Sequence, residues 1–106
     1  MMNASIDEPN GDTHITQADG SIFDDLGYPP ERSEVLKVKA ALMTAIHQTI
    51  DDRGLTEEDA ANRFGVPQAR IAELRRGKIS LFTTEQLVAM LAHAGMQVEV
   101  NVQAAA

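Results

Sequence analysis

The sequence predicts a mainly α-helical domain of four to five helices, followed by a single β-strand. Three patterns indicate this fold class. Apolar residues recur at helical spacing within residues 31–53, two short helical segments flank a glycine within residues 56–78, and apolar and polar residues alternate over residues 96–102. A chain of 106 residues has room for one small domain. We therefore expect an acidic N-terminal segment (1–30), a helical domain (31–95) and a C-terminal strand.

The N-terminal segment differs in charge from the remainder of the chain. Residues 1–34 hold eight carboxylates and one arginine, a net charge of 1 − 8 = −7, whereas residues 35–106 hold eight acidic and eight basic residues. Roughly the first 20 residues offer too little apolar surface to offset the entropy of ordering, so we expect them to be disordered. Apolar and aromatic residues then follow, which we expect to fold back onto the domain or to bind a partner: Ile22, Phe23, Leu26 and Tyr28.

Residues 31–53 predict one long helix. Leu42, Ile46 and Ile50 repeat at intervals of four, which places them on one face of a helix. Gly54 suits the position just after the last helical turn, where the backbone must adopt a left-handed conformation. We therefore expect the helix to end immediately before this glycine.

The next segment encodes two short helices joined by a tight turn. Thr56 suits the N-cap of the first helix, and Gly65 allows the sharp turn that follows it. Pro67 fits the first turn of the second helix, where its missing N–H is not needed. Ile71 and Leu74 are three residues apart and should both face the core. This arrangement is a helix-turn-helix, a motif whose second helix enters the DNA major groove.

Charge and side-chain chemistry support DNA as the partner of this motif. Between Arg63 and Lys78 there are five basic residues and one acidic residue, a net charge of 5 − 1 = +4. Phosphates respond to charges within a Debye length of about 8–10 Å, so this local excess matters more than the net charge of the chain. The alternative is that these five basic residues form an ordinary solvated face of the protein.

Within the second helix, the side chains divide into two roles. Gln68 can pair with adenine through two hydrogen bonds, and Glu73 can accept one from the amino group of cytosine. With Ala69, these residues are expected to face the bases. The other predicted DNA-binding residues are the cap residue and the cations that neutralise phosphates: Thr56, Arg70, Arg75, Arg76 and Lys78.

A further helix and a strand complete the predicted domain. Thr83 and Gln86 form a capping box ahead of an apolar helical segment that ends at Gly95. The alternation that follows is a strand signal, with apolar positions at Met96, Val98, Val100 and Val102. A lone strand leaves backbone groups unpaired, so we expect it to pair antiparallel with its copy in a homodimer. Pairing with residues 13–17 of the same chain is the alternative.

The motif resembles the Cro/cI-type (XRE-like) helix-turn-helix, and the resemblance implies a lambda-repressor-like bundle. In that family the residue after the N-cap threonine is commonly Gln, whereas here it is Glu57, whose carboxylate would repel a phosphate. The residues that carry the resemblance are Thr56, Ala60, Gly65, Val66, Gln68, Ile71, Leu74 and the ending Arg76-Gly77-Lys78.

Two flanking segments extend the resemblance to the small HigA-like antitoxins of type II toxin–antitoxin modules. These are IFDDLGYP (22–29) and LFTTEQLVAMLAHAGMQVEVNV (81–102), so the resemblance covers roughly residues 15–102. It implies a repressor of its own operon that binds double-stranded DNA at a palindromic operator. It also implies that the acidic segment wraps a small basic toxin that cleaves RNA. A stand-alone regulator without a toxin is the main alternative, and an interaction module that has lost DNA binding is a third.

Other classes of function lack their characteristic residues. The chain has no cysteine, its three histidines are far apart in sequence, and no phosphate-binding loop or nucleophile motif is present. We therefore expect no enzyme activity, no cofactor and no metal. The longest apolar run, Leu87–Ala92, is much shorter than the roughly 18 residues of a membrane span. Without a signal peptide, a cytoplasmic location is expected.

Overall fold

The computed structural model describes residues 27–104. Three of the predicted partner-binding residues, Ile22, Phe23 and Leu26, lie outside this range. So do the alternative strand partner at residues 13–17 and the first 20 residues or so, which were expected to be disordered. Within the described range the chain forms five helical elements: α2 (Pro30–Arg53), α3 (Glu57–Phe64), α4 (Gln68–Arg75), the short 3-10 helix η2 (Ile79–Leu81) and α5 (Thr84–His93).

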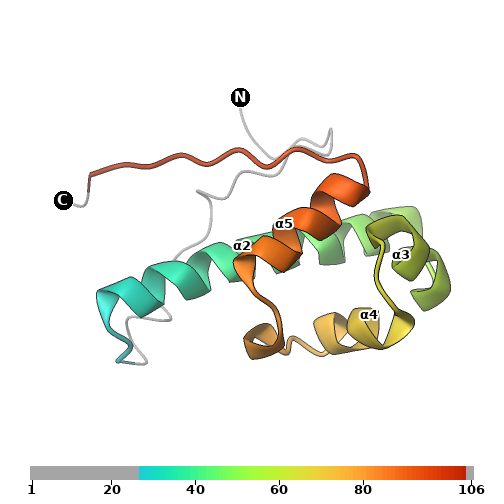
Figure 1. Cartoon of the computed structure of the whole chain (residues 1–106), viewed down its shortest axis with the longest axis horizontal. Coiled ribbons are helices and arrows are strands. Elements are labelled where there is room, and N and C mark those ends of the chain that lie inside the picture. Colours follow the sequence, from blue (N-terminus) through green and yellow to red (C-terminus); the bar gives the residue numbers. More distant parts are fainter. Residues whose placement is uncertain (1–26, 105–106) are drawn as a thin grey trace.

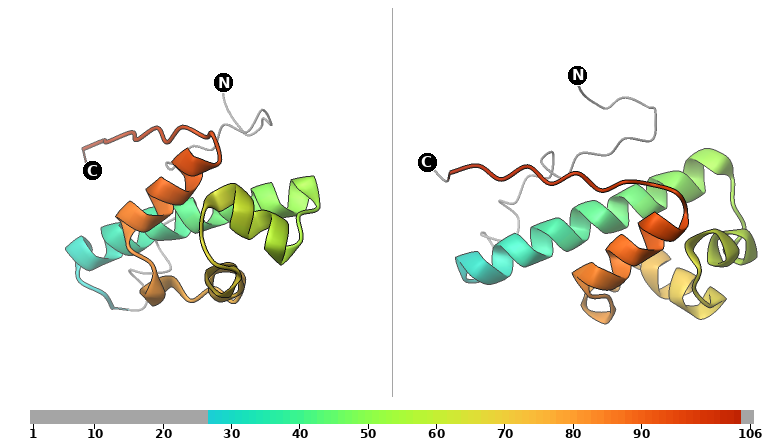
Figure 2. Two further views of the ribbon diagram at one scale, coloured as in Figure 1. Left: turned by 45° about the vertical axis from the view of Figure 1, so that its right-hand side comes forward. Right: turned by 45° about the horizontal axis from the view of Figure 1, so that its top comes forward.

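α2 is the longest helix of the domain, and the shorter helices pack along its C-terminal part (Figure 1). Its 24 residues correspond to a length of about 36 Å at 1.5 Å per residue. α5 packs against α2, and α3 packs against both α4 and α5. The C-terminal segment runs along one side of the domain and α4 lies on the opposite side, an arrangement visible from two further directions (Figure 2).

Local sequence signals set the ends of the helices. α2 ends at Arg53 and is capped by Gly54, whose φ of 59° is left-handed, as predicted. The Thr56 hydroxyl caps α3 by accepting a hydrogen bond of 3.0 Å from the backbone N–H of Asp59. The predicted capping box of α5 is also confirmed, since Thr83 and Gln86 exchange bonds of 2.9 and 3.0 Å between side chain and backbone.

The start of α4 differs from the prediction by a residue. Pro67 was expected within the first turn of the second short helix, but it is the N-cap, and α4 begins at Gln68. Its ψ of 155° is extended, so the chain turns into the helix only after the proline. The carbonyl of Pro67 still accepts a bond of 3.0 Å from the N–H of Arg70, which closes the first turn.

The core is aliphatic with two phenylalanines, and it fixes the motif against α2. Ile71 and Leu74 of α4 are both 0% exposed, which confirms that they face inward. They pack in one cluster with Ile46 of α2 and Phe64 of α3. Burial of each such side chain contributes about 1.5–3 kcal/mol of stabilisation relative to exposure. The position of α4 is therefore set mainly by apolar packing.

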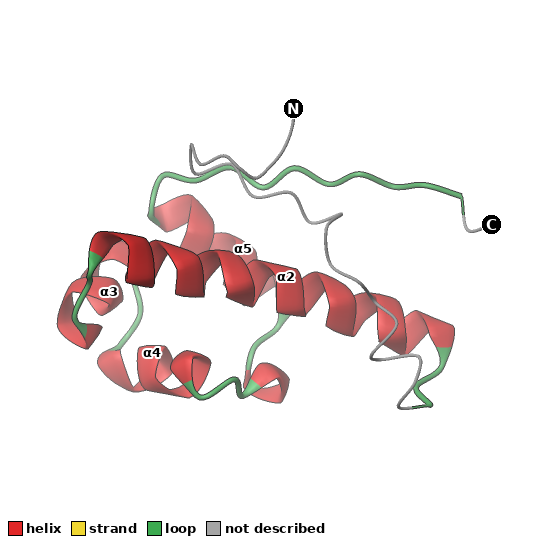
Figure 3. Ribbon diagram, turned by 180° about the vertical axis from the view of Figure 1, so that it is seen from behind, coloured by secondary structure: helices red, strands yellow, loops and turns green. Residues whose placement is uncertain are grey.

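The predicted strand is not formed within residues 27–104; the segment after Gly95 is extended, with one isolated bridge position at Glu99 and no regular strand (Figure 3). A strand requires repeated backbone pairing with a neighbour, and the described part of a single chain supplies no adjacent strand. Met96 and Val98 nevertheless pack against the core cluster. Val100 and Val102 are 68% and 85% exposed. The dimer pairing expected for these four residues therefore remains a prediction.

Candidate nucleic-acid interface

The turn between α3 and α4 is held in place by α5. Gly65 has a left-handed φ of 71°, and the ring of His93 packs directly against it. A Cβ on Gly65 would lie 2.8 Å from Cδ2 of His93, which is closer than real contacts allow. Nδ1 of His93 is also 3.0 Å from the backbone oxygen of Arg63, a hydrogen-bonding distance. Together these contacts fix the angle at which α4 leaves the turn.

The first turn of α4 presents the two residues best placed to meet base edges. Gln68 and Ala69 are exposed, whereas Ile71 and Leu74 on the inner face are fully buried. Residues at the start of a recognition helix are those that typically reach into the major groove. The structure therefore leaves this end of α4 accessible to a DNA duplex. Thr56, the cap residue of α3, is likewise exposed.

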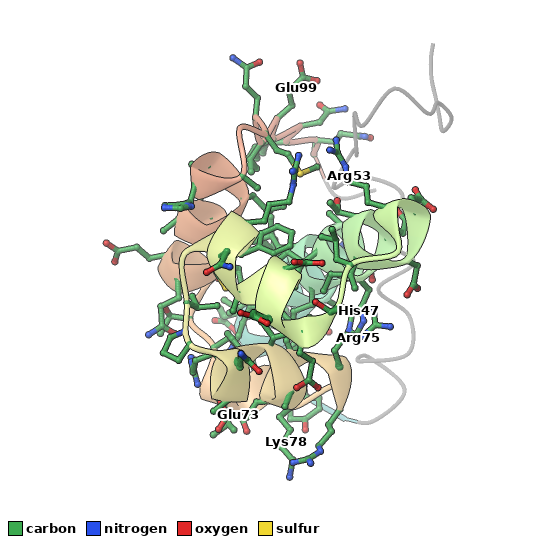
Figure 4. The ribbon with its side chains drawn as sticks, turned by 90° about the vertical axis from the view of Figure 1, so that its right-hand side faces the viewer. His47, Arg53, Glu73, Arg75, Lys78 and Glu99 are labelled. Carbon is green, nitrogen blue, oxygen red and sulfur yellow. The ribbon has the colours of Figure 1, made fainter. Side chains whose placement is uncertain are left out.

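Arg75, expected to neutralise a phosphate, is turned toward α2. Its guanidinium lies 2.8 Å from Oδ1 of Asp51 and 3.0 Å from Nδ1 of His47 (Figure 4). Burial lowers the pKa of His47 below 6.5, and the positive charge of Arg75 lowers it further. A hydrogen bond with the Leu74 backbone and the charge of Asp51 oppose this shift. The neutral imidazole can therefore accept the Arg75 N–H, which ties the end of α4 to α2.

Arg70 and Glu73 pair with each other on α4. Nη1 of Arg70 donates to Oε1 of Glu73 at 2.7 Å, and the guanidinium carbon lies 4.1 Å from the centre of the Phe82 ring. The two side chains are 28% and 32% exposed. Glu73 was expected to face the bases and Arg70 a phosphate, whereas the structure pairs the two side chains with each other.

Arg76 and Lys78 lie just beyond α4 and are exposed. Among the residues that the structure describes, neither takes part in an ion pair. Gly77 between them has a φ of 74°, and the N–H of Lys78 donates to the Glu73 carbonyl at 3.1 Å. Glu73 and Lys78 project at the edge formed by α4, at the opposite end of the molecule from Glu99 (Figure 4). These two cations are thus available to phosphates.

The cations of the motif therefore do not act as one group. Arg70 and Arg75 are paired with carboxylates, and the buried Nε of Arg63 has no hydrogen-bond partner within the described residues. The local charge of +4 was counted over residues 63–78, which leaves out Asp51 of α2. Because Asp51 pairs with Arg75, the positive charge available to a phosphate is smaller than this count. Assignment of the eight predicted residues to bases and phosphates remains a prediction.

The sequence did not predict several residues that contact Arg70 and Arg75. His47 and Asp51 are 28 and 24 residues from Arg75, and Leu81 and Gln86 are 11 and 16 residues from Arg70. No short motif links positions so far apart. A pattern of helical spacing predicts which side faces the core, but it does not predict which polar groups meet at the edge of the core.

Tyr28, the one predicted partner-binding residue within the described range, is 43% exposed just before α2. Among residues 27–104 there is no group of three potential metal ligands. No helix in the same range is both long and apolar enough to cross a membrane.

Comparison with known proteins assigns the fold to a family. No curated protein and no solved structure matches the chain significantly. The model of a helix-turn-helix domain, however, matches residues 22–103, which include every helix from α2 to α5. Domains of this type bind DNA through the second helix of the motif, the position that α4 holds here. The chain therefore belongs to this family of helix-turn-helix domains and is a DNA-binding regulator.

Proposed function

We propose that the protein is a sequence-specific repressor that binds a palindromic operator as a homodimer. The observation that carries this proposal is the division of α4 into a buried face and an exposed first turn. Ile71 and Leu74 anchor the helix, Gln68 and Ala69 are open to bases, and Arg76 and Lys78 follow as exposed cations. A rigid helix with polar groups at its open end suits major-groove recognition.

The position of the C-terminal segment supports dimerisation away from the DNA. It lies on the side of the domain opposite α4 (Figures 1 and 2). Antiparallel pairing of residues 96–102 about a two-fold axis would leave both α4 helices facing the same side. It would also cover Val100 and Val102, which are largely exposed in the single chain. Half-sites about 34–36 Å apart would then be read by the two helices.

A narrower role as the antitoxin of a type II toxin–antitoxin module is part of this proposal. Its support is the resemblance to HigA-like antitoxins and the charge of −7 within residues 1–34, which would complement a small basic toxin. The protein would repress its own operon and neutralise an RNA-cleaving toxin. In this role it acts by binding, in the cytoplasm, without a cofactor or a catalytic step of its own.

DNA binding is tested by titrating the protein into a duplex taken from upstream of its own gene, at several salt concentrations and against random competitor DNA. We expect competitor-resistant binding of two protomers per site, with affinity that falls steeply as salt rises because counterions are released. Binding of one protomer per site would refute the dimer. Absence of salt-dependent binding would refute the repressor and favour an interaction module.

The antitoxin role is tested with a variant that lacks residues 1–26 and keeps α2 intact. The partner to use is the product of the neighbouring gene, if that product is small and basic. We expect the full chain to block RNA cleavage by this protein, and the truncated chain to bind DNA normally but leave cleavage unaffected. A full chain that neither binds nor inhibits the neighbour would favour a stand-alone regulator.

A further inference from the structure

Arg70 is the most connected side chain on α4. Its Nη2 group lies 2.8 Å from the backbone oxygen of Leu81 and 3.4 Å from Oε1 of Gln86, while Nη1 donates to Glu73 at 2.7 Å. The guanidinium also lies over the ring of Phe82, 4.1 Å from its centre. One side chain thus connects α4, η2 and the first turn of α5.

These contacts conflict with a phosphate-binding role. To reach a phosphate, the guanidinium would have to leave a charge-assisted bond of 2.7 Å and uncover Phe82, which is 1% exposed. It would also release Gln86, whose Oε1 already accepts the N–H of Thr83 in the capping box of α5. Arg76, by contrast, is exposed and makes no ion pair within residues 27–104, so it can reach a phosphate without breaking such contacts.

The same contacts define the direction of Glu73. A glutamate on a helix surface samples several rotamers, but a bond to a fixed guanidinium selects one of them. Glu73 projects at the edge formed by α4, near the exposed cation Lys78 (Figure 4). Its carboxylate can accept a hydrogen bond from the amino group of a cytosine. Pairing with Arg70 also offsets a negative charge that would otherwise face the DNA.

We propose that Arg70 is a positioning residue for DNA readout, which orients Glu73 as a specificity-determining carboxylate and holds the η2 turn against α5 without contacting a phosphate. This inference rests on the proposed sequence-specific DNA binding. It gives Arg70 a different role from the one predicted by its charge alone.

The experiment compares four variants with the wild type on duplexes selected from a random pool by the wild-type protein. The variants are Arg70→Lys, Glu73→Gln, their double variant, and Arg76→Gln as the matched control. For each, affinity is measured against salt and against a panel of single base-pair changes in the selected site. Thermal unfolding of every variant confirms that binding is compared between folded proteins.

Arg70→Lys keeps the positive charge but loses the planar fork that contacts Glu73, Leu81 and Gln86 together. We expect it to lose about five-fold or more discrimination at one base pair, the same pair that Glu73→Gln affects. The double variant should lose no more than either single variant, because both act through one contact. The salt slope should stay at its wild-type value in all three, whereas Arg76→Gln should lower it by about 0.9 per lost phosphate contact.

Two results would overturn the inference. Wild-type discrimination in Arg70→Lys would show that only the charge of Arg70 matters, as for a phosphate contact. Losses at different base pairs for Arg70→Lys and Glu73→Gln would show that the two side chains act separately. Failure of the wild-type protein to select any duplex would instead refute the proposed DNA binding, a result readily distinguished from the other two.

Discussion

The inner and outer sides of α4 differ in their contacts with the rest of the domain. On the inner side, Ile71 and Leu74 are fully buried, and Arg75 is tied to α2 through Asp51. On the outer side, Gln68 and Arg76 are exposed. Arg75 and Arg76 are adjacent in sequence, but Arg75 pairs with Asp51 of α2, whereas Arg76 makes no ion pair within residues 27–104. Changes on the inner side should act on folding, and changes on the outer side should act on DNA binding.

The largest effect is expected from Leu74→Ala, which removes a buried anchor of α4. A leucine that is 0% exposed leaves a cavity when truncated, so the free energy of unfolding should fall by about 2–5 kcal/mol. Chemical denaturation measures this loss. The control is Arg76→Ala, which should leave the free energy of unfolding within about 0.5 kcal/mol of the wild type. Equal losses for both variants would remove the distinction between the two sides.

Gly65→Ala should have the next largest effect. A left-handed backbone costs an alanine about 1–2 kcal/mol, and the added Cβ would also clash with His93. Gly54→Ala is the matched control, because its φ of 59° is also left-handed but no atom lies within 4 Å of the added Cβ. Thermal unfolding should show the greater loss at position 65. If the two losses are equal, His93 does not constrain the turn.

On the outer side, Gln68→Ala should change which sequences are bound without destabilising the fold. Loss of a two-bond contact with adenine would reduce discrimination at one base pair by about 1–3 kcal/mol. Arg76→Ala should instead weaken binding to every sequence and lower the salt slope. Binding to a panel of single base-pair variants separates these outcomes. Equal, sequence-independent effects of the two changes would show that the roles are assigned incorrectly.

The smallest effect concerns the polar anchor of the inner side, His47. Its pKa is lowered in the folded protein by burial and by Arg75, so the unfolded chain takes up a proton first as the pH falls below about 6.5. The contribution of the neutral imidazole to stability is complete above pH 6.5 and decreases as the pH falls toward the folded pKa. Because the Arg75 pair is partly exposed, this contribution should be modest.

The variant His47→Gln tests this pH dependence, since glutamine can accept a hydrogen bond but does not titrate. Urea denaturation between pH 8 and 5 should show that the wild type loses stability more steeply than the variant below pH 6.5. Parallel pH profiles would show that the His47 contact with Arg75 is not coupled to folding. Arg75→Ala serves as a control, because it removes one of the two causes that lower the pKa.

The helical elements and the motif follow from signals local to the sequence. Helical spacing of apolar residues predicted α2 and the inward direction of Ile71 and Leu74, and glycine and threonine signals predicted the ends at Gly54 and Thr56. These features depend on interactions between residues close in the chain, such as caps and helix periodicity, so a linear pattern suffices to predict them.

Which polar side chains of the motif are bonded to other helices depends on tertiary packing. Arg70 and Arg75 meet partners from η2, α5 and α2 that lie 11–28 residues away, and packing of the core brings those partners within hydrogen-bonding distance. A strand over residues 96–102 could be anticipated from alternation, but it requires a neighbouring strand, and residues 27–104 contain none. The physical reason is the same in both cases. A polar side chain or a strand needs a hydrogen-bonding partner, and the chain brings that partner near only when it folds or associates.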